Sequence, residues 1–307
     1  MAAPGGNRAL LHGSEVEIFK LLSEEASPRK WAEWLRAPLE YAAVTGNFGV
    51  VTTLLGAGAD ASTTRRGSER CGALYAATMG GHHVLVGDLL EHGACPNGKD
   101  NMGDAPLHLA AYKGRALTAS ALLEGGAEKN AVNSWGDTPV HLAVLGGHVD
   151  VAHRLLRAGA DPNVRTTQFD YPVSPLHAAA ASCNLDMVNL LIRHGADITA
   201  VDCDGHNVLH YACSTRKGDQ AGTVCALLAA GIPIDSHTDI GSSTALHLAS
   251  TTLRKDGAGV LALLQAGATV DCKDFKDETP LHSACSIGNV PVVQVLLRWG
   301  ADETAVN

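Results

Sequence analysis

A seven-residue phrase centred on a histidine recurs along the chain and constrains its fold more than any other feature. A typical copy reads APLHLAA around His108, and two weaker copies place Glu40 and Tyr75 at or next to the histidine position. The period is 33 residues with small insertions, which predicts about eight similar units that each pack on their neighbours. The six clear copies occupy residues 105–111, 138–144, 174–180, 207–213, 244–250 and 279–285.

Each phrase has the residues that begin a short helix. Thr138 before Pro139 supplies an N-cap hydroxyl, and proline at the first helical position loses no hydrogen bond. Leucine and alanine at helical spacing give this helix a narrow apolar face, and a glycine such as Gly147 ends it. Bulkier valine and leucine residues then predict a second helix, as at residues 149–156. Each unit is therefore predicted to be two helices joined by turns.

These residues resemble the ankyrin repeat, a 33-residue unit with the pattern T-P-L-H-x-A, over roughly residues 37–307. The resemblance implies an all-α solenoid of about eight helix-turn-helix units with projecting β-hairpin-like fingers. It also implies that the repeated histidines bond to the backbone of neighbouring fingers, and that partners bind a concave face of fingers and first helices. Residues 1–36 are predicted to be a capping segment, a degenerate partial repeat in which Trp31 and Trp34 cover an apolar end.

The charge and hydropathy of the chain argue against two classes of partner. Its net charge is −9, from 23 basic and 32 acidic residues, which disfavours binding to nucleic acid. Every apolar run is shorter than the roughly 18 residues needed to span a bilayer, so no membrane partner is expected. Eight scattered cysteines without a CxxC motif favour a reducing compartment, and the predicted location is cytoplasmic, with the nucleus as an alternative. We expect a monomer, although the apolar residues 290–299 leave end-to-end association open.

The sequence contains no assembled catalytic motif. Neither a G-x-S-x-G elbow nor H-E-x-x-H is present. Most of the 15 histidines occupy repeat positions, and identical residues on successive units do not converge on one metal ion. We therefore expect neither enzyme activity nor a cofactor or metal site in this chain.

The predicted binding residues stand where the repeat imposes no identity, at the fingertips and at the ends of the first helices. Trp135 and Tyr171 hold comparable finger positions on adjacent repeats, which predicts an aromatic anchor with an acidic rim. Such a rim favours a basic peptide or basic protein surface. The alternative is that these aromatic residues only pack finger on finger. The predicted set is Asn101, Met102, Asp104, Tyr112, Lys113, Trp135, Asp137, Phe169, Asp170 and Tyr171.

The predicted function is that of a non-catalytic scaffold or adaptor that binds a protein partner on the concave face of fingers and first helices. A rigid stack presents its side chains at little ordering cost, so binding needs no cofactor. Two alternatives stay open. The chain could be the substrate-targeting segment of a larger enzyme or channel that continues beyond residue 307, or a structural spacer without a specific partner.

Overall fold

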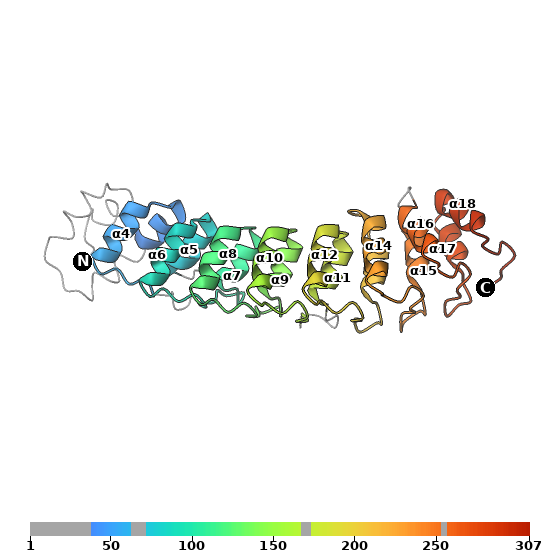
Figure 1. Ribbon diagram of the computed structural model, residues 1–307, viewed down its shortest axis with the longest axis horizontal. Coiled ribbons are helices and arrows are strands. Elements are labelled where there is room, and N and C mark those ends of the chain that lie inside the picture. The colour runs from blue at the N-terminus through green and yellow to red at the C-terminus, as the bar shows by residue number, and fades with distance from the viewer. Residues whose placement is uncertain (1–37, 63–71, 167–172, 253–256) are drawn as a thin grey trace, which may run out of the picture. The chain divides into compact units, whose positions relative to one another are not determined.

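The computed structural model describes residues 38–62, 72–166, 173–252 and 257–307 (Figure 1). These residues form two compact units, the first ending at residue 160 and the second beginning at residue 161. Each unit repeats one motif, a pair of short helices followed by a hairpin-like finger. The predicted capping segment, residues 1–36, lies outside the described residues, and so do Trp31 and Trp34. The domain boundary at residue 37 stays a prediction.

The described part of the first unit contains four helix pairs. First helices pack on first helices, as α7 does on α5 and α9, and second helices pack on second helices, as α8 does on α6 and α10. The pairs are 38–45 with α4 (Phe48–Gly56), α5 (Gly72–Gly80) with α6 (His83–Glu91), α7 (Pro106–Tyr112) with α8 (Ala116–Glu124), and α9 (Pro139–Leu145) with α10 (Val149–Arg157).

The described part of the second unit contains four further pairs, stacked in the same way. The prediction of an all-α array of about eight helix-turn-helix units is confirmed. Among the described residues the β structure amounts to one isolated antiparallel bridge, between Val201 and Asn207. The pairs are α11 (Pro175–Ser182) with α12 (Leu185–Arg193), α13 (Val208–Ser214) with α14 (Gln220–Ala229), α15 (Ala245–Thr251) with α16 (Ala258–Gln265), and α17 (Pro280–Ser286) with α18 (Val290–Arg298).

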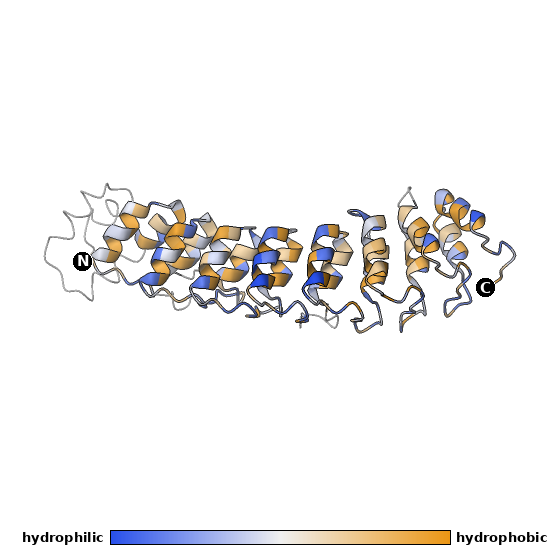
Figure 2. Ribbon diagram, viewed as in Figure 1, coloured by the Kyte–Doolittle hydropathy of each residue, from blue (hydrophilic) through white to orange (hydrophobic). Residues whose placement is uncertain are grey.

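The core of each unit is a continuous layer of small and branched apolar side chains. Ala110 and Ala143 in the first helices have no exposed surface, and neither do Leu122 and Leu155 in the second helices. Alanine lets neighbouring first helices approach closely, whereas leucine fills the wider space between second helices. Hydrophobic and hydrophilic residues alternate on the same helices, as expected for helices that are buried on one side (Figure 2).

Three of the repeated histidines connect their helix pair to the next finger. The backbone N–H of Ala105 donates to Nδ1 of His108 at 3.1 Å, and Nε2 lies 3.1 Å from the carbonyl oxygen of Asp137. Because Nδ1 accepts, Nε2 carries the proton and donates to that carbonyl. The rings of His210 and His247 reach the next finger in the same way, at 3.1 and 3.0 Å. At these three positions the bonding implied by the resemblance is confirmed.

The N-cap hydroxyls contact the imidazoles more closely than the backbone they were predicted to cap. Thr138 Oγ1 lies 2.9 Å from Nδ1 of His141 but 3.5 Å from its backbone nitrogen. Ser174 Oγ lies equally close to Nδ1 of His177. Asn207 behaves as a conventional N-cap, since its side-chain oxygen accepts two backbone N–H groups of α13 at 3.0 and 3.1 Å. The starts of α9, α11 and α13 are thus stabilised by cap and imidazole together.

None of the helices in the described ranges is long and apolar enough to cross a membrane.

Candidate interaction surface

The fully described fingers are hairpins that are each closed by one polar side chain near the start. Asp100 Oδ1 accepts the backbone N–H groups of Met102 and Asp104 at 2.9 and 2.8 Å. Asn133 makes the same two bonds in the next finger, both at 2.9 Å. Gly103 at the turn has a φ of 77°, a conformation that side-chain-bearing residues rarely adopt. The tip residues of each finger are therefore held in a defined geometry without using their own side chains.

Adjacent fingers are joined into rows. In the first unit the backbone N–H of Ser134 donates to the carbonyl oxygen of Met102 at 2.9 Å, and Asn133 Nδ2 donates to Asp104 Oδ1 at 2.9 Å. In the second unit the backbone N–H of Asp239 donates to the carbonyl oxygen of Asp204, in the preceding finger, at 2.8 Å. These cross-finger bonds restrict motion of one finger against the next. Residues 100–104 and 133–137 therefore form one surface, the finger face of the first unit.

Three carboxylates gather on or beside this finger face. Tyr75, which replaces the repeat histidine, donates its hydroxyl to Asp100 Oδ2 at 2.9 Å. Burial raises the pKa of Asp104 above its ordinary value, although the hydrogen bond from Asn133 opposes this. Burial and, second, the charge of Asp104 raise the pKa of Asp137. The finger face thus holds negative charges that are partly removed from water and lie close to one another.

The structure brings five predicted binding residues together on the finger face. Asn101 and Met102 are exposed, and Met102 presents 46% of its surface. Trp135 is half-buried, and so are Asp104 and Asp137. An apolar tip therefore stands next to partly desolvated carboxylates, and the aromatic anchor with an acidic rim stays a prediction. The remaining finger residues, Phe169, Asp170 and Tyr171, lie outside the described residues, so the pairing of Trp135 with Tyr171 stays a prediction.

Tyr112 and Lys113 belong to a different surface. Tyr112 is the last of the seven residues of α7 and Lys113 follows it, whereas the first residue of α7 adjoins the finger face, and a helix rises about 1.5 Å per residue. They therefore lie about 10 Å from the fingers, at the turn between α7 and α8. Lys113 Nζ stands 5.6 Å from the ring centroid of Tyr112. The predicted binding residues therefore lie on two separate surfaces, the fingers and the turns between first and second helices.

Sequence reasoning missed three residues that shape the finger face. Tyr75 was noted only as a weak match to the repeat histidine, yet its hydroxyl reaches Asp100 of the next finger. Asp100 and Asn133 were not singled out, although each one orders a fingertip. The available signal was their position, since a carboxylate or amide residue stands eight residues before His108, His141, His210 and His282.

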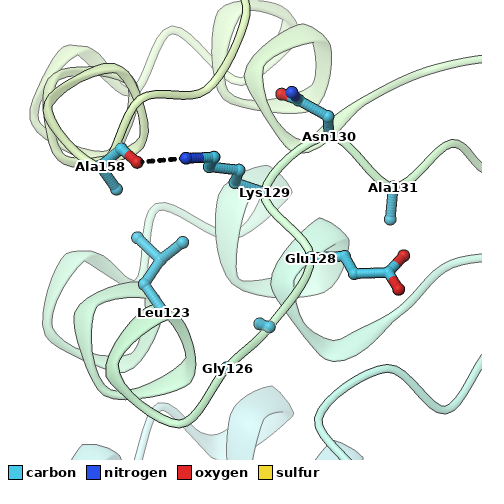
Figure 3. Close-up of a pocket in the computed structure, with 8 residues that line it drawn as sticks. Leu123, Gly126, Glu128, Lys129, Asn130, Ala131 and Ala158 are labelled. Atoms are coloured by element: carbon cyan, nitrogen blue, oxygen red, sulfur yellow. Dashed lines mark hydrogen bonds between the residues drawn. The ribbon is translucent and has the colours of Figure 1, made fainter.

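A separate hollow of about 560 Å³ lies between the end of α8 and the end of α10 (Figure 3). Lys129 Nζ is the one ammonium in its lining, and it donates to the carbonyl oxygen of Ala158 at 2.8 Å. Most of the other lining groups are small side chains and backbone, so the hollow offers little to orient a ligand. Its lining residues are Leu123, Gly126, Ala127, Glu128, Lys129, Asn130, Ala131 and Ala158.

Titratable side chains do not cluster into a metal site in the part of the chain that the structure describes. No group of three or more histidine, cysteine or acidic side chains there is placed to hold a metal ion. The free cysteines among these residues are dispersed over several repeats, as expected from the sequence.

Comparison with protein families agrees with this architecture. The family described as ankyrin repeats, in three copies, matches residues 39–133, 74–166, 141–238 and 216–307. The chain therefore belongs to the ankyrin-repeat family, whose repeats generally serve as modules of protein interaction.

The chain matches less than a third of the length of the two relatives named here. It is 35% identical over 128 residues to the transient receptor potential cation channel subfamily A member 1 homolog of Caenorhabditis elegans, a match that covers 42% of this chain and 10% of the relative. It is 33% identical over 133 residues to the B-cell lymphoma 3 protein homolog of Mus musculus, covering 43% of this chain and 29% of the relative.

A solved structure shares the fold. The crystal structure of the human ASB11 ankyrin repeat domain superposes with a TM-score of 0.65 at 24% identity, covering 75% of this chain and 99% of that domain.

Proposed function

We propose that this chain is a non-catalytic scaffold or adaptor that binds a protein partner through its fingers and first helices. The finger face of the first unit is the best candidate for the contact. The observation that carries the proposal is the exposed Met102 and half-buried Trp135 beside Asp104 and Asp137, whose pKa values burial raises. Apolar anchors beside partly desolvated charges are the groups that concentrate binding energy at interfaces.

The charge of the finger face favours a basic peptide or basic protein surface. A lysine or arginine of the partner would replace the water that Asp104 and Asp137 have lost. Hydrogen bonds between ionised groups of this kind contribute about 1.5–3 kcal/mol each. The cross-finger bonds, such as that from Ser134 to Met102, hold the surface in place before binding and so lower its ordering cost. A monomeric state and a cytoplasmic or nuclear location belong to the same proposal.

A second candidate function is the targeting segment of a larger enzyme or channel. The cation channel homolog supports it, since the similar region makes up only 10% of that protein. Sequencing the full transcript distinguishes the two functions, because a catalytic or channel domain in the same reading frame would favour the second.

The test is affinity capture from cell extract with the intact chain and with a Met102→Ser/Trp135→Ala variant. A matched control changes Ile240→Ser, an apolar fingertip residue of the second unit that is 68% exposed. Circular dichroism first establishes that all three proteins are folded. Partners that are lost only from the first variant support the finger face, and Asp104→Asn should then weaken the binding of the purified partner. Partners retained by every variant place the contact elsewhere, and a complete lack of partners favours a spacer.

A further inference from the structure

A second surface of the first unit exposes large apolar side chains where each first helix turns into its second helix. These residues stand at or beside the end of a first helix or the start of a second helix. Together with the turns between them they form the turn edge of the first unit. The first helices contribute Met79, Tyr112 and Leu145, which are 47, 53 and 62% exposed, and the second helices contribute Phe48, Val84 and Leu117, which are 47, 62 and 54% exposed.

The stacking of the helices orders these residues into two rows. Helix α7 packs on α5 and α9, so Met79, Tyr112 and Leu145 follow one another along the stack. Helix α8 packs on α6, which sets Leu117 beside Val84. Packed helices are about 8–10 Å apart, so a row over three helix pairs is about 20 Å long. The order of the helices can be followed in Figure 1.

Cationic and imidazole side chains lie between the two rows. Each crosses the turn of the preceding helix pair: His82 Nε2 is 3.2 Å from the carbonyl oxygen of Val44, and His148 Nε2 is 3.0 Å from that of Tyr112. Arg115 takes the equivalent position in the pair α7 and α8. It lies against the turn of the preceding pair, because a Cβ added to Gly81 would be 2.9 Å from Nε of Arg115.

The fixed charges of the turn edge are mostly positive. Lys113 lies beside the ring of Tyr112, and Arg115 starts the next helix. Asp150 is the carboxylate of the same edge, and its Oδ1 accepts the N–H of the residue that follows it at 2.9 Å. The turn edge thus has two cations at its centre and one carboxylate towards its end, in contrast to the acidic finger face.

The second unit shows that the fold does not require the apolar row at the ends of the first helices. Its helix pairs have the same architecture, yet small or polar side chains occupy the position that Tyr112 has in α7. Scattered exposed apolar residues are common, but a contiguous group that the fold does not need marks a contact surface. The equivalent residues of the second unit are Ala181, Ser214, Thr251 and Ser286.

We propose that the turn edge of the first unit binds an acidic amphipathic helix of a protein partner. A helix of about 14 residues is about 21 Å long, which matches the length of a row. Apolar side chains at every third or fourth position of such a helix can enter the space around Tyr112 and Leu117. Its carboxylates then face Lys113 and Arg115. This contact is independent of the proposed finger face, whose charge has the opposite sign.

The test uses two fluorescent 14-residue peptides with the same leucine face. One carries glutamate on its polar face and the other carries lysine. Fluorescence anisotropy measures their binding to the intact chain and to a Tyr112→Ser/Leu117→Ser variant. A matched control, Ile240→Ser/Phe275→Ser, removes two apolar fingertip residues of the second unit that are 68 and 67% exposed. Circular dichroism again checks the fold of each variant.

The glutamate peptide is expected to bind the intact chain and the control with equal affinity. Its affinity for the turn-edge variant should be at least about tenfold lower, a change in binding free energy of about 1.4 kcal/mol. Arg115→Glu should reverse the preference between the two peptides. Trp135→Ala should have no effect, which separates this proposal from the finger face. Failure of the glutamate peptide to bind at about 1 mM, or equal binding of both peptides, would overturn the proposal. The proposal would also be overturned if the chain bound anionic phosphatidylserine vesicles in place of the peptide and the Tyr112→Ser/Leu117→Ser variant did not bind them.

Discussion

Replacing the buried His210 with leucine is expected to lower the free energy of unfolding of the second unit by about 3 kcal/mol at neutral pH. The imidazole is 1% exposed, accepts from the backbone N–H of Asn207 at 3.1 Å and donates to the carbonyl oxygen of Ser236 at 3.1 Å. Leucine removes both hydrogen bonds. It leaves a buried N–H and a carbonyl without these partners, and each such loss costs about 1–2 kcal/mol.

This cost should shrink in acid, because burial and, second, His206 lower the pKa of His210 to about 4. A histidine in the unfolded chain binds its proton near pH 6.5, whereas the folded ring stays neutral down to about pH 4. Protons therefore favour unfolding as the pH falls from about 6.5 to 4, and the intact chain loses up to about 3 kcal/mol through this one group. The leucine variant lacks this loss. Other buried histidines affect both proteins alike, so their contributions cancel in the difference.

Urea unfolding followed by circular dichroism, near pH 7 and near pH 5, measures the difference in unfolding free energy. The control is Asn289→Leu, which removes a hydrogen bond of 2.8 Å from Asn289 Nδ2 to the carbonyl oxygen of Thr252 but no titrating group. Its cost should be equal at both values of pH. A cost for His210→Leu that is equally independent of pH would refute the inference that a neutral imidazole joins the repeats.

Three further changes test other parts of the structure by urea unfolding. Gly114→Ala should lower the free energy of unfolding by about 1–2 kcal/mol, because the φ of Gly114 is 70° and an added Cβ would lie 2.6 Å from the ring of His148. The control Gly56→Ala should be neutral or slightly stabilising, because the space around Gly56 is open. Asp137→Asn should raise the unfolding free energy at neutral pH, since the raised pKa shows that its charge opposes folding, and the gain should vanish below about pH 4. Tyr211→Phe should cost about 1–2 kcal/mol, because the hydroxyl donates to Asp202 Oδ2 at 2.8 Å.

The candidate sites could be predicted only in part. Asn101, Met102 and Trp135 were predicted because tip positions are free of repeat constraints, and the structure places them on one surface. Partial burial of Asp104 and Asp137 could not be predicted, because it depends on how closely the next finger packs. The separation of Tyr112 from the fingers followed only when the length and direction of α7 were known. The contrast between the turn edges of the two units was also missed, although the residues themselves are visible in the sequence.

Local chemistry explains why the sequence by itself determined the repeat. The proline at the start of a first helix and the glycine after it act within a few residues, as Pro139 and Gly147 do. Each repeat needs only the neighbouring repeats to bury its apolar face, so the period is enough to predict the stack. Only the tertiary structure decided which surface residues contact one another and which charged groups are partly removed from water. Asp104 and Asn133 are 29 residues apart, yet they meet at 2.9 Å because the stack places one finger against the next. Such a distance is a property of packing and is not carried by the identity of either residue.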